Sequence, residues 1–251
     1  MSKLNRVICV TLLVGSAACV TAQDEESGID PAEPEAPAKG SAPASVDSDG
    51  DRTSSFTDAC LLPGMTKVAF NPTTFYDADD EGVTTARDLP FPFQLYGATQ
   101  TKFWITTNGQ LGFGSTPGGS IFGRVSCPLA DSRLRTPILL AYSADLVGRS
   151  DPGAGVCFAT TGVAPRRQLV VTWKDSYFYE AWLTSHVTFS ATLNEGTNVI
   201  DVAIDRASAP DLSFYESGYG AALGKQSGGT GYAFSCYQSR APAGTVVHYN
   251  P

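Results

Sequence analysis

Two alternating runs joined by Asn108-Gly109 constrain the fold of this chain more than any other feature. In FPFQLYGATQTKFWITTNGQLGF, residues 91–113, the apolar side chains of Phe103, Ile105, Leu111 and Phe113 fall on one face of an extended chain. Asn-Gly between such runs is typical of a tight β-hairpin, because both turn residues must accept a positive φ. The segment therefore predicts two antiparallel strands with one buried face.

A second pair of alternating runs extends this pattern. The run HVTFSATL, residues 186–193, and the run VIDVAI, residues 199–204, are joined by a turn over residues 194–198. No helical period of useful length lies between them. The inward faces of the two hairpins favour an all-β fold, a jelly-roll-like antiparallel β-sandwich of two sheets with about ten strands. Four residues of the first run share its predicted inward face: Val187, Phe189, Ala191 and Leu193.

Short motifs spread over residues 60–251 give the chain a resemblance to a known family. They are FPF (91–93), YG (96–97), GFG (112–114), PIL (137–139), ADL (144–146), APRR (164–167), VVTW (170–173), LNEG (193–196) and GTVV (244–247). Their order resembles that of nidogen-like β-sandwich domains of bacterial surface proteins. The resemblance implies adhesion or display rather than catalysis. The family often has Trp-Asp-Asp where this chain has Ser143-Ala144-Asp145, so a metal site that needs both acids has lost one here.

The first residues have the order of a secretory signal peptide. Two basic residues precede an apolar run, residues 7–14, that is too short to span a bilayer. Two processing routes stay open. Cleavage after Ala22 removes residues 1–22, whereas lipidation of Cys19 in the lipobox-like Ser-Ala-Ala-Cys removes residues 1–18. The chain is predicted to be extracytoplasmic, either as an outer-membrane lipoprotein or as a secreted protein.

An acidic linker separates this signal from the globular part. Residues 23–55 are rich in Pro, Ala, Ser, Asp and Glu and carry nine acids and two bases, so their net charge is 2 − 9 = −7. So little apolar surface cannot offset the entropy of ordering, and like charges keep the chain extended. We expect a disordered tether over residues 23–55 and one β-sandwich domain over residues 56–251.

The charge of the globular part does not suit nucleic acid. Residues 56–251 carry 13 bases and 16 acids, which provide no positive field for phosphates or anionic lipids. The predicted partner is an envelope or extracellular protein or a glycan. Contact with a membrane is expected only through the lipid anchor.

Four cysteines follow the signal: Cys60, Cys127, Cys157 and Cys236. An even number in an exported protein predicts two disulfides, and the absence of Cys-x-x-Cys argues against zinc. Three pairings are open. We favour Cys127–Cys157 with Cys60–Cys236, which would close one loop and join the two ends of the domain.

Residues suited to catalysis are few. His186 shares the outward face of its run with Thr188 and Ser190, and His248 lies close to the C-terminal end. Both histidines are expected to be structural. The sequence contains no Gly-x-Ser-x-Gly, His-Glu-x-x-His or phosphate-binding loop. The chain is therefore predicted not to be an enzyme, and a hydrolase with His186 as the base is kept as an alternative.

Acidic residues offer one metal hypothesis. Asp77, Asp79, Asp80 and Glu81 crowd a turn before the first family-like strand. Alternating carboxylates in a β loop can bind Ca²⁺ through oxygen, although a solvated turn explains the same pattern. Calcium at this turn is the only cofactor that the sequence suggests.

Aromatic residues supply the remaining binding hypothesis. Trp104 alternates with Phe103 and Ile105, so it points away from their buried face. Four more aromatic residues crowd the segment SYFYEAW: Tyr177, Phe178, Tyr179 and Trp182. Such side chains stack on sugar rings or form a protein hot spot, or they fold over the sandwich as a small core. They support a carbohydrate-binding jelly-roll domain as an alternative to display or adhesion.

Overall fold

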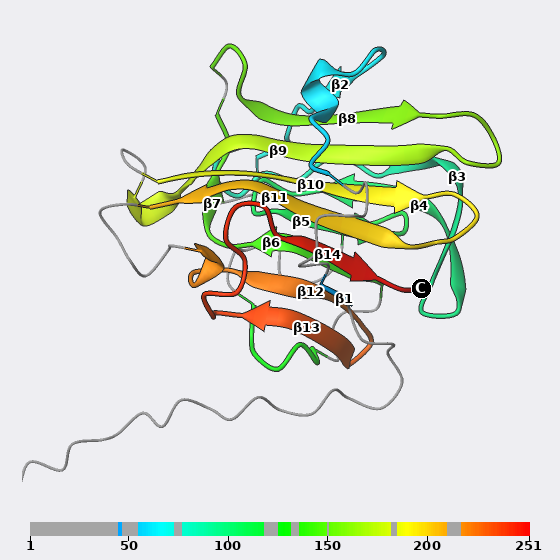
Figure 1. Ribbon diagram of the computed structural model, residues 1–251. Helices are drawn as coiled ribbons and strands as arrows, with labels where there is room; N and C mark the ends of the chain where they lie inside the picture. Colours follow the sequence, from blue (N-terminus) through cyan, green and yellow to red (C-terminus); the bar gives the residue numbers. More distant parts are fainter. Residues whose placement is uncertain are drawn as a thin grey trace, which may run out of the picture. The chain divides into compact units, whose positions relative to one another are not determined.

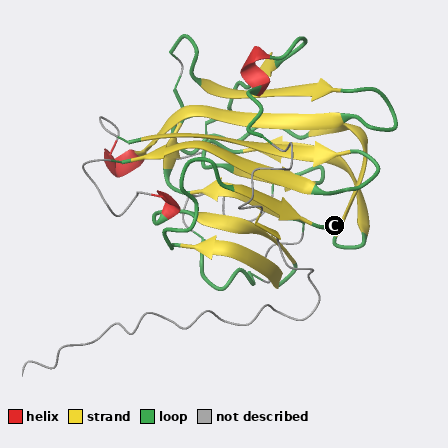
Figure 2. Cartoon of the chain, viewed as in Figure 1, coloured by secondary structure: helices red, strands yellow, loops and turns green. Residues whose placement is uncertain are grey.

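The computed structural model describes residues 45–46, 55–72, 77–117, 125–131, 136–149, 151–181, 185–209 and 217–251. Strands dominate this part of the chain, and helix is limited to short turns such as η1 (Ala59–Leu61) and η2 (Tyr179–Ala181) (Figure 2). None of the helices among these residues has the length and apolar character needed to cross a membrane. The predicted all-β class is confirmed.

The larger sheet has eight antiparallel strands (Figure 1). Their order is β1 (Ser45–Val46), β14 (Val246–Tyr249), β11 (Ile200–Ser208), β10 (His186–Asn194), β9 (Gln168–Phe178), β8 (Gly155–Thr161) and β2 (Thr66–Lys67), with β7 (Leu146–Val147) paired to β9. The hairpin β10–β11 is the one predicted over residues 186–204. Because β1 pairs with β14, two residues of the stretch predicted as a disordered tether belong to the sheet.

The smaller sheet has six strands. Their order is β13 (Thr230–Cys236), β12 (Ala222–Ser227), β6 (Ile138–Ser143), β5 (Gln110–Phe113), β4 (Ala98–Ile105) and β3 (Arg87–Leu95), all antiparallel. Within the described residues the two sheets contain more strands than the ten or so predicted. The difference arises partly because the two-residue strands β1, β2 and β7 also pair.

The core lies between the two sheets and is built from the predicted faces. The inward residues of both predicted hairpins are wholly buried in one apolar cluster. At its centre Phe189 of β10 stacks on Trp173 of β9 and on Tyr142 of β6, with ring centroids 4.9 Å and 5.2 Å away. The indole N–H of Trp173 donates to the carbonyl oxygen of Thr106 over 2.8 Å, which joins the larger sheet to the first hairpin.

The turn of the first hairpin differs from the prediction. The Thr106 N–H donates to the carbonyl oxygen of Gln110 over 3.0 Å, which leaves a loop of three residues between them. Of Asn108 and Gly109, only the glycine has a positive φ, of 72°. The expectation of two positive φ angles is wrong, because a three-residue loop requires one only at its last position. A Cβ at residue 109 would lie 2.1 Å from the carbonyl oxygen of Tyr142, so glycine also allows close packing on β6.

Each disulfide lies against one sheet. Cys60 pairs with Cys157 and Cys127 pairs with Cys236, with Cα–Cα distances of 5.2 Å and 6.3 Å. The prediction of two disulfides is confirmed, but the favoured pairing Cys127–Cys157 with Cys60–Cys236 is wrong. Cys60 in η1 packs on β8 of the larger sheet, whereas Cys236 belongs to β13 of the smaller one and Cys127 lies in a loop beside it. The favoured pairs would therefore have had to cross the core.

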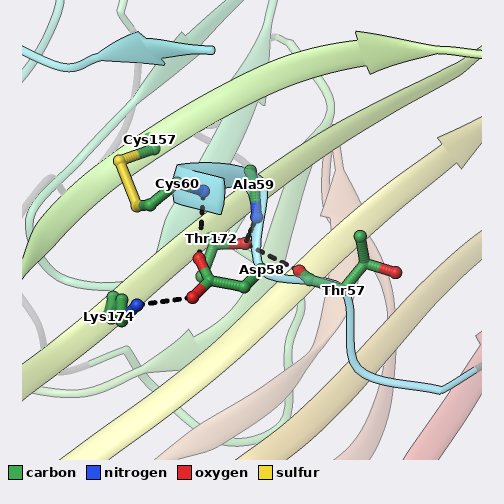
Figure 3. The surroundings of a disulfide bond; sticks show 7 residues. All are labelled: Thr57, Asp58, Ala59, Cys60, Cys157, Thr172 and Lys174. Carbon is green, nitrogen blue, oxygen red and sulfur yellow. Dashed lines mark hydrogen bonds and ion pairs between the residues drawn. A yellow bond between two sulfur atoms is a disulfide. The ribbon is translucent and has the colours of Figure 1, made fainter. Parts of the chain in front are cut away.

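The disulfide Cys60–Cys157 holds the start of the domain across the larger sheet (Figure 3). The Ala59 N–H donates to the hydroxyl of Thr172 on β9, and that hydroxyl donates to the carbonyl oxygen of Thr57, each over 2.9 Å. Asp58 and Lys174 form an ion pair of 2.5 Å. Residues 57–60 therefore lie over the outer face of β9 and β8.

Candidate functional site

Three carboxylates meet at the tip of the first hairpin. Asp80 and Glu81 come from the turn before Val83, and Asp145 comes from the turn between β6 and β7. One carboxylate oxygen from each lies within 4.8 Å of the other two. Glu81 is only 7% exposed, and Oδ1 of Asp80 is buried without a hydrogen-bond partner. We call Asp80, Glu81 and Asp145 the acidic cluster.

Side chains of the hairpin loop hold the acidic cluster together. The amide group of Asn108 donates to Oε2 of Glu81 over 2.6 Å, and its carbonyl oxygen accepts the N–H of Leu146 over 2.7 Å. The Thr107 hydroxyl donates to the carbonyl oxygen of Asp80 and accepts the N–H of Gly82. The Asn-Gly turn therefore has a second role, because it fixes two acidic segments that are far apart in the sequence.

The acidic cluster holds a proton more tightly than isolated carboxylates do. Burial, followed by the charges of Asp145 and Asp80, raises the pKa of Glu81 to about 7, although the Asn108 hydrogen bond acts in the opposite direction. Burial and the charge of Asp77 raise the pKa of Asp80. No cationic group is among the causes of either shift. A proton or a cation would therefore relieve the repulsion between these carboxylates.

The structure changes the membership of the predicted calcium site. Asp80 and Glu81 remain, but Asp77 and Asp79 are exposed and lie outside the group of three. Asp145, which stands where the family often has Trp-Asp-Asp, takes their place. Carboxylate oxygens from two loops are ligands that suit Ca²⁺. Calcium binding itself stays a prediction.

The aromatic ligand-contact predictions are corrected in two places. Trp104 does point away from the main core, but it is wholly buried in a second apolar cluster with Leu129, Ile138 and Leu140. The segment around Leu129 covers the outer face of the smaller sheet, so this indole is not available to a sugar. Phe178 is also wrong as a contact residue, because it is 1% exposed and belongs to the main core.

Two residues of the aromatic segment remain at the surface. Tyr179 is 56% exposed and Tyr177 is partly buried. Trp182 lies outside the described residues, as does the lipidation candidate Cys19. Among the described residues of the segment, only Tyr177 and Tyr179 could therefore contribute to a surface for stacking on a sugar.

His186 lies in an ion-pair network. Its Nδ1 is 2.8 Å from Oδ1 of Asp175, whose carboxylate also contacts Arg149 at 3.2 Å and Arg206 at 3.4 Å. Asp175 has a positive φ of 56°, and its N–H donates to the hydroxyl of Thr188 over 3.0 Å. His186 and two arginines therefore share one carboxylate, which fixes the position of the imidazole.

The face that carries His186 is less open than predicted. Thr188 is 7% exposed and Ser190 is 1% exposed, so the outward face on which they were predicted is largely covered at these two positions. Ser190 lies opposite Thr172, which residues 57–59 cover. The crossing segment accounts for the burial of this part of the face.

A polar pocket opens further along the same face. Its volume is about 420 Å³, and it lies over β9, β10, β11 and β14 beside Ser55 and Thr57. His248 and Asp201 line it and are paired across β14 and β11, with 2.5 Å between Nδ1 and Oδ1. The sequence predicts only a structural role for His248. We call this site the sheet pocket.

Comparison with known proteins identifies the family. A family model described as NIDO related matches residues 51–249. The chain belongs to the NIDO-related family. This match confirms the nidogen-like resemblance found in the sequence. No curated protein and no solved structure gives a significant match.

Replacing Glu81 by glutamine should flatten the pH dependence of stability of this NIDO-related domain. The folded state keeps the Glu81 proton up to about pH 7, whereas an ordinary glutamate loses it near 4.5. Between these values the folded state binds more protons, so the free energy of unfolding falls as the pH rises, by at most about 1.4 kcal/mol per pH unit. Glutamine removes this slope and can still accept the Asn108 hydrogen bond. Urea unfolding across this pH range measures the difference.

Asp79→Asn is the matched control, because Asp79 is exposed and outside the acidic cluster. It should keep the wild-type slope. If the free energy of unfolding depended on pH equally in the wild type and in Glu81→Gln, the raised pKa of Glu81 would be contradicted. If calcium binds here, added Ca²⁺ at about pH 8 should raise the melting temperature of the wild type and of Asp79→Asn, but not of Glu81→Gln.

Proposed function

We propose that this chain is a non-enzymatic display or adhesion module that acts outside the cytoplasm. The observation that carries the proposal is the family match over residues 51–249, because a NIDO-related domain fits an extracellular binding module. Two disulfides agree with an oxidising compartment. The partner is an envelope or extracellular protein or a glycan.

We further propose that a lipid on Cys19 anchors the mature protein in an envelope membrane, the outer one where there are two. The apolar run that ends near Ser-Ala-Ala-Cys and the acidic, proline-rich stretch after it support the anchor. Several acyl chains on one cysteine hold a protein firmly, whereas a single chain binds only marginally. The stretch after Cys19 then acts as a spacer between the membrane and the sandwich.

Cys19→Ala should move the protein from the membrane fraction to the soluble extracytoplasmic fraction. Residues 20–22, Val-Thr-Ala, still offer an ordinary cleavage site, so export itself should continue. Cell fractionation followed by immunoblotting measures the shift. Cys9→Ala, inside the apolar run of the signal, is the matched control and should leave the protein in the membrane fraction.

Two results would count against the proposal. N-terminal sequencing that finds Gln23 as the first residue of the wild-type protein would exclude the anchor and leave a secreted module. Turnover of any glycan, peptide or ester substrate by the purified mature protein would contradict the non-enzymatic function. If His186→Ala removed that turnover, the hydrolase alternative would replace the non-enzymatic function.

A further inference from the structure

The sheet pocket contains a row of polar side chains that crosses four adjacent strands. Gln168 of β9 donates to the side-chain oxygen of Asn194 on β10 over 2.7 Å, and Asn194 donates to Oδ2 of Asp201 on β11 over 2.8 Å. His248 of β14 completes the row through Asp201. Thr192 lies directly opposite Asp201 in the register. Each side chain in the row is held by its neighbour, so the binding groups are oriented in advance.

The wall of the pocket beside this row is also fixed. Ser55 and Thr57 line the pocket, and the carbonyl oxygen of Thr57 accepts the Thr172 hydroxyl. The Asp58–Lys174 ion pair and the Cys60–Cys157 disulfide hold the next residues against β9 and β8 (Figure 3). The pocket therefore has its floor in the sheet, and its wall runs into residues that an ion pair and a disulfide hold on the same sheet.

The lining chemistry selects a neutral ligand rich in hydroxyl groups. Side-chain amides and hydroxyls both donate and accept hydrogen bonds, as sugar hydroxyls do. No lysine or arginine lines the pocket among the described residues, which disfavours phosphates, and only Val199 and Ala203 are apolar. These two side chains suit the C–H face of a sugar ring but are too few for an apolar ligand. The volume of about 420 Å³ lies in the range of small-ligand sites.

We propose that the sheet pocket binds one unit of a neutral saccharide. This inference rests on the proposed binding function and names its ligand class and site. Gln168, Thr192 and Asn194 provide the hydrogen bonds, while the Asp201–His248 pair fixes the end of the row. No aromatic side chain lines the pocket among the described residues, so binding lacks a stacking contribution and should be weak for a single sugar unit. Many copies on one membrane would strengthen attachment to a glycan with repeated units.

The test uses the full mature chain and a set of methyl glycosides of glucose, galactose, mannose and N-acetylglucosamine. Saturation-transfer NMR should detect at least one of them at millimolar concentration. Thr192→Val and Gln168→Met keep the size of the side chain and remove polar groups, so each should weaken binding about three- to tenfold. Thr160→Val, at an exposed position of β8 outside the pocket, is the matched control and should bind like the wild type. Melting temperatures verify that all variants are folded.

Different experimental results would contradict the saccharide site and the proposed display function. If no glycoside binds, or if Thr192→Val and Gln168→Met bind as well as Thr160→Val, the sheet pocket is not a saccharide site, and the display function is unaffected. Binding of inorganic phosphate in place of the glycosides would also overturn the inference. Chemical conversion of a bound glycoside would confirm the site but contradict the non-enzymatic function.

Discussion

Phe189→Ala should lower the free energy of unfolding by about 3–5 kcal/mol. Phe189 is wholly buried between the rings of Trp173 and Tyr142, so alanine would leave a cavity between the two sheets. The loss is a large part of the 5–15 kcal/mol that typically stabilises a domain. Urea unfolding followed by tryptophan fluorescence measures it, because Trp173 lies beside the cavity.

Thr192→Ala is the matched control for Phe189→Ala. Thr192 lies on the same strand, on the outer face, and is only partly buried. It is a better control than Thr188, which is buried and accepts the Asp175 N–H. The control should cost less than about 1 kcal/mol. Equal losses in the two variants would show that the register of β10 is wrong.

Replacing Cys127 and Cys236 together by serine should cost about 4–5 kcal/mol. The bond joins two cysteines that are 109 residues apart in the sequence. Without the bond, the unfolded chain gains conformational entropy, and this gain is larger for a longer loop, so the folded state becomes less stable. Cys236 also packs against the cluster around Trp104. The variant should therefore melt at a lower temperature and let an external quencher reach a tryptophan that the wild type protects.

A double replacement of Cys60 and Cys236 distinguishes the observed pairing from the one favoured from the sequence. In the observed pairing this variant loses both disulfides and keeps two free thiols, so it should be less stable than Cys127→Ser/Cys236→Ser. In the pairing favoured from the sequence it would keep Cys127–Cys157. Thiol titration of the unfolded variants decides between them, and finding no free thiol in Cys60→Ser/Cys236→Ser would contradict the structure.

The alternation of residues predicted the two-sheet sandwich because it is a local property. Whether Val187, Phe189 and Ile105 face inward depends only on their position in a strand, and the structure confirms each of them. The burial of Trp104 depends on the segment around Leu129, which is distant in sequence and covers the smaller sheet. Period-two alternation separates the two faces of a strand, but it does not show which face another segment covers.

The same limit applies to the candidate sites. Asp80 and Glu81 were predicted from their spacing, whereas Asp145 joins them only through the arrangement of β6, β7 and the hairpin. The sheet pocket was missed because it requires the register of four strands. The polar residues Thr192 and Asn194 alternate with inward residues, and this alternation is the only sign of the pocket in the sequence of this strand. The strand pairing is needed to show that Thr192 lies opposite Asp201 and that Asn194 lies opposite Gln168.

The Cys60–Cys157 bond has a mechanical consequence for a domain held by its N-terminus. With the anchor proposed above, tension would first meet the pairing of β1 with β14 and the contacts of residues 57–59 with β9. Beyond them, Cys60 would pass the load into β8 through the covalent bond. The stretch between the two cysteines, which includes the first hairpin and the acidic cluster, would then form a closed loop that carries no load. Such a pull would load the larger sheet, while the loops at the hairpin tip would keep their geometry.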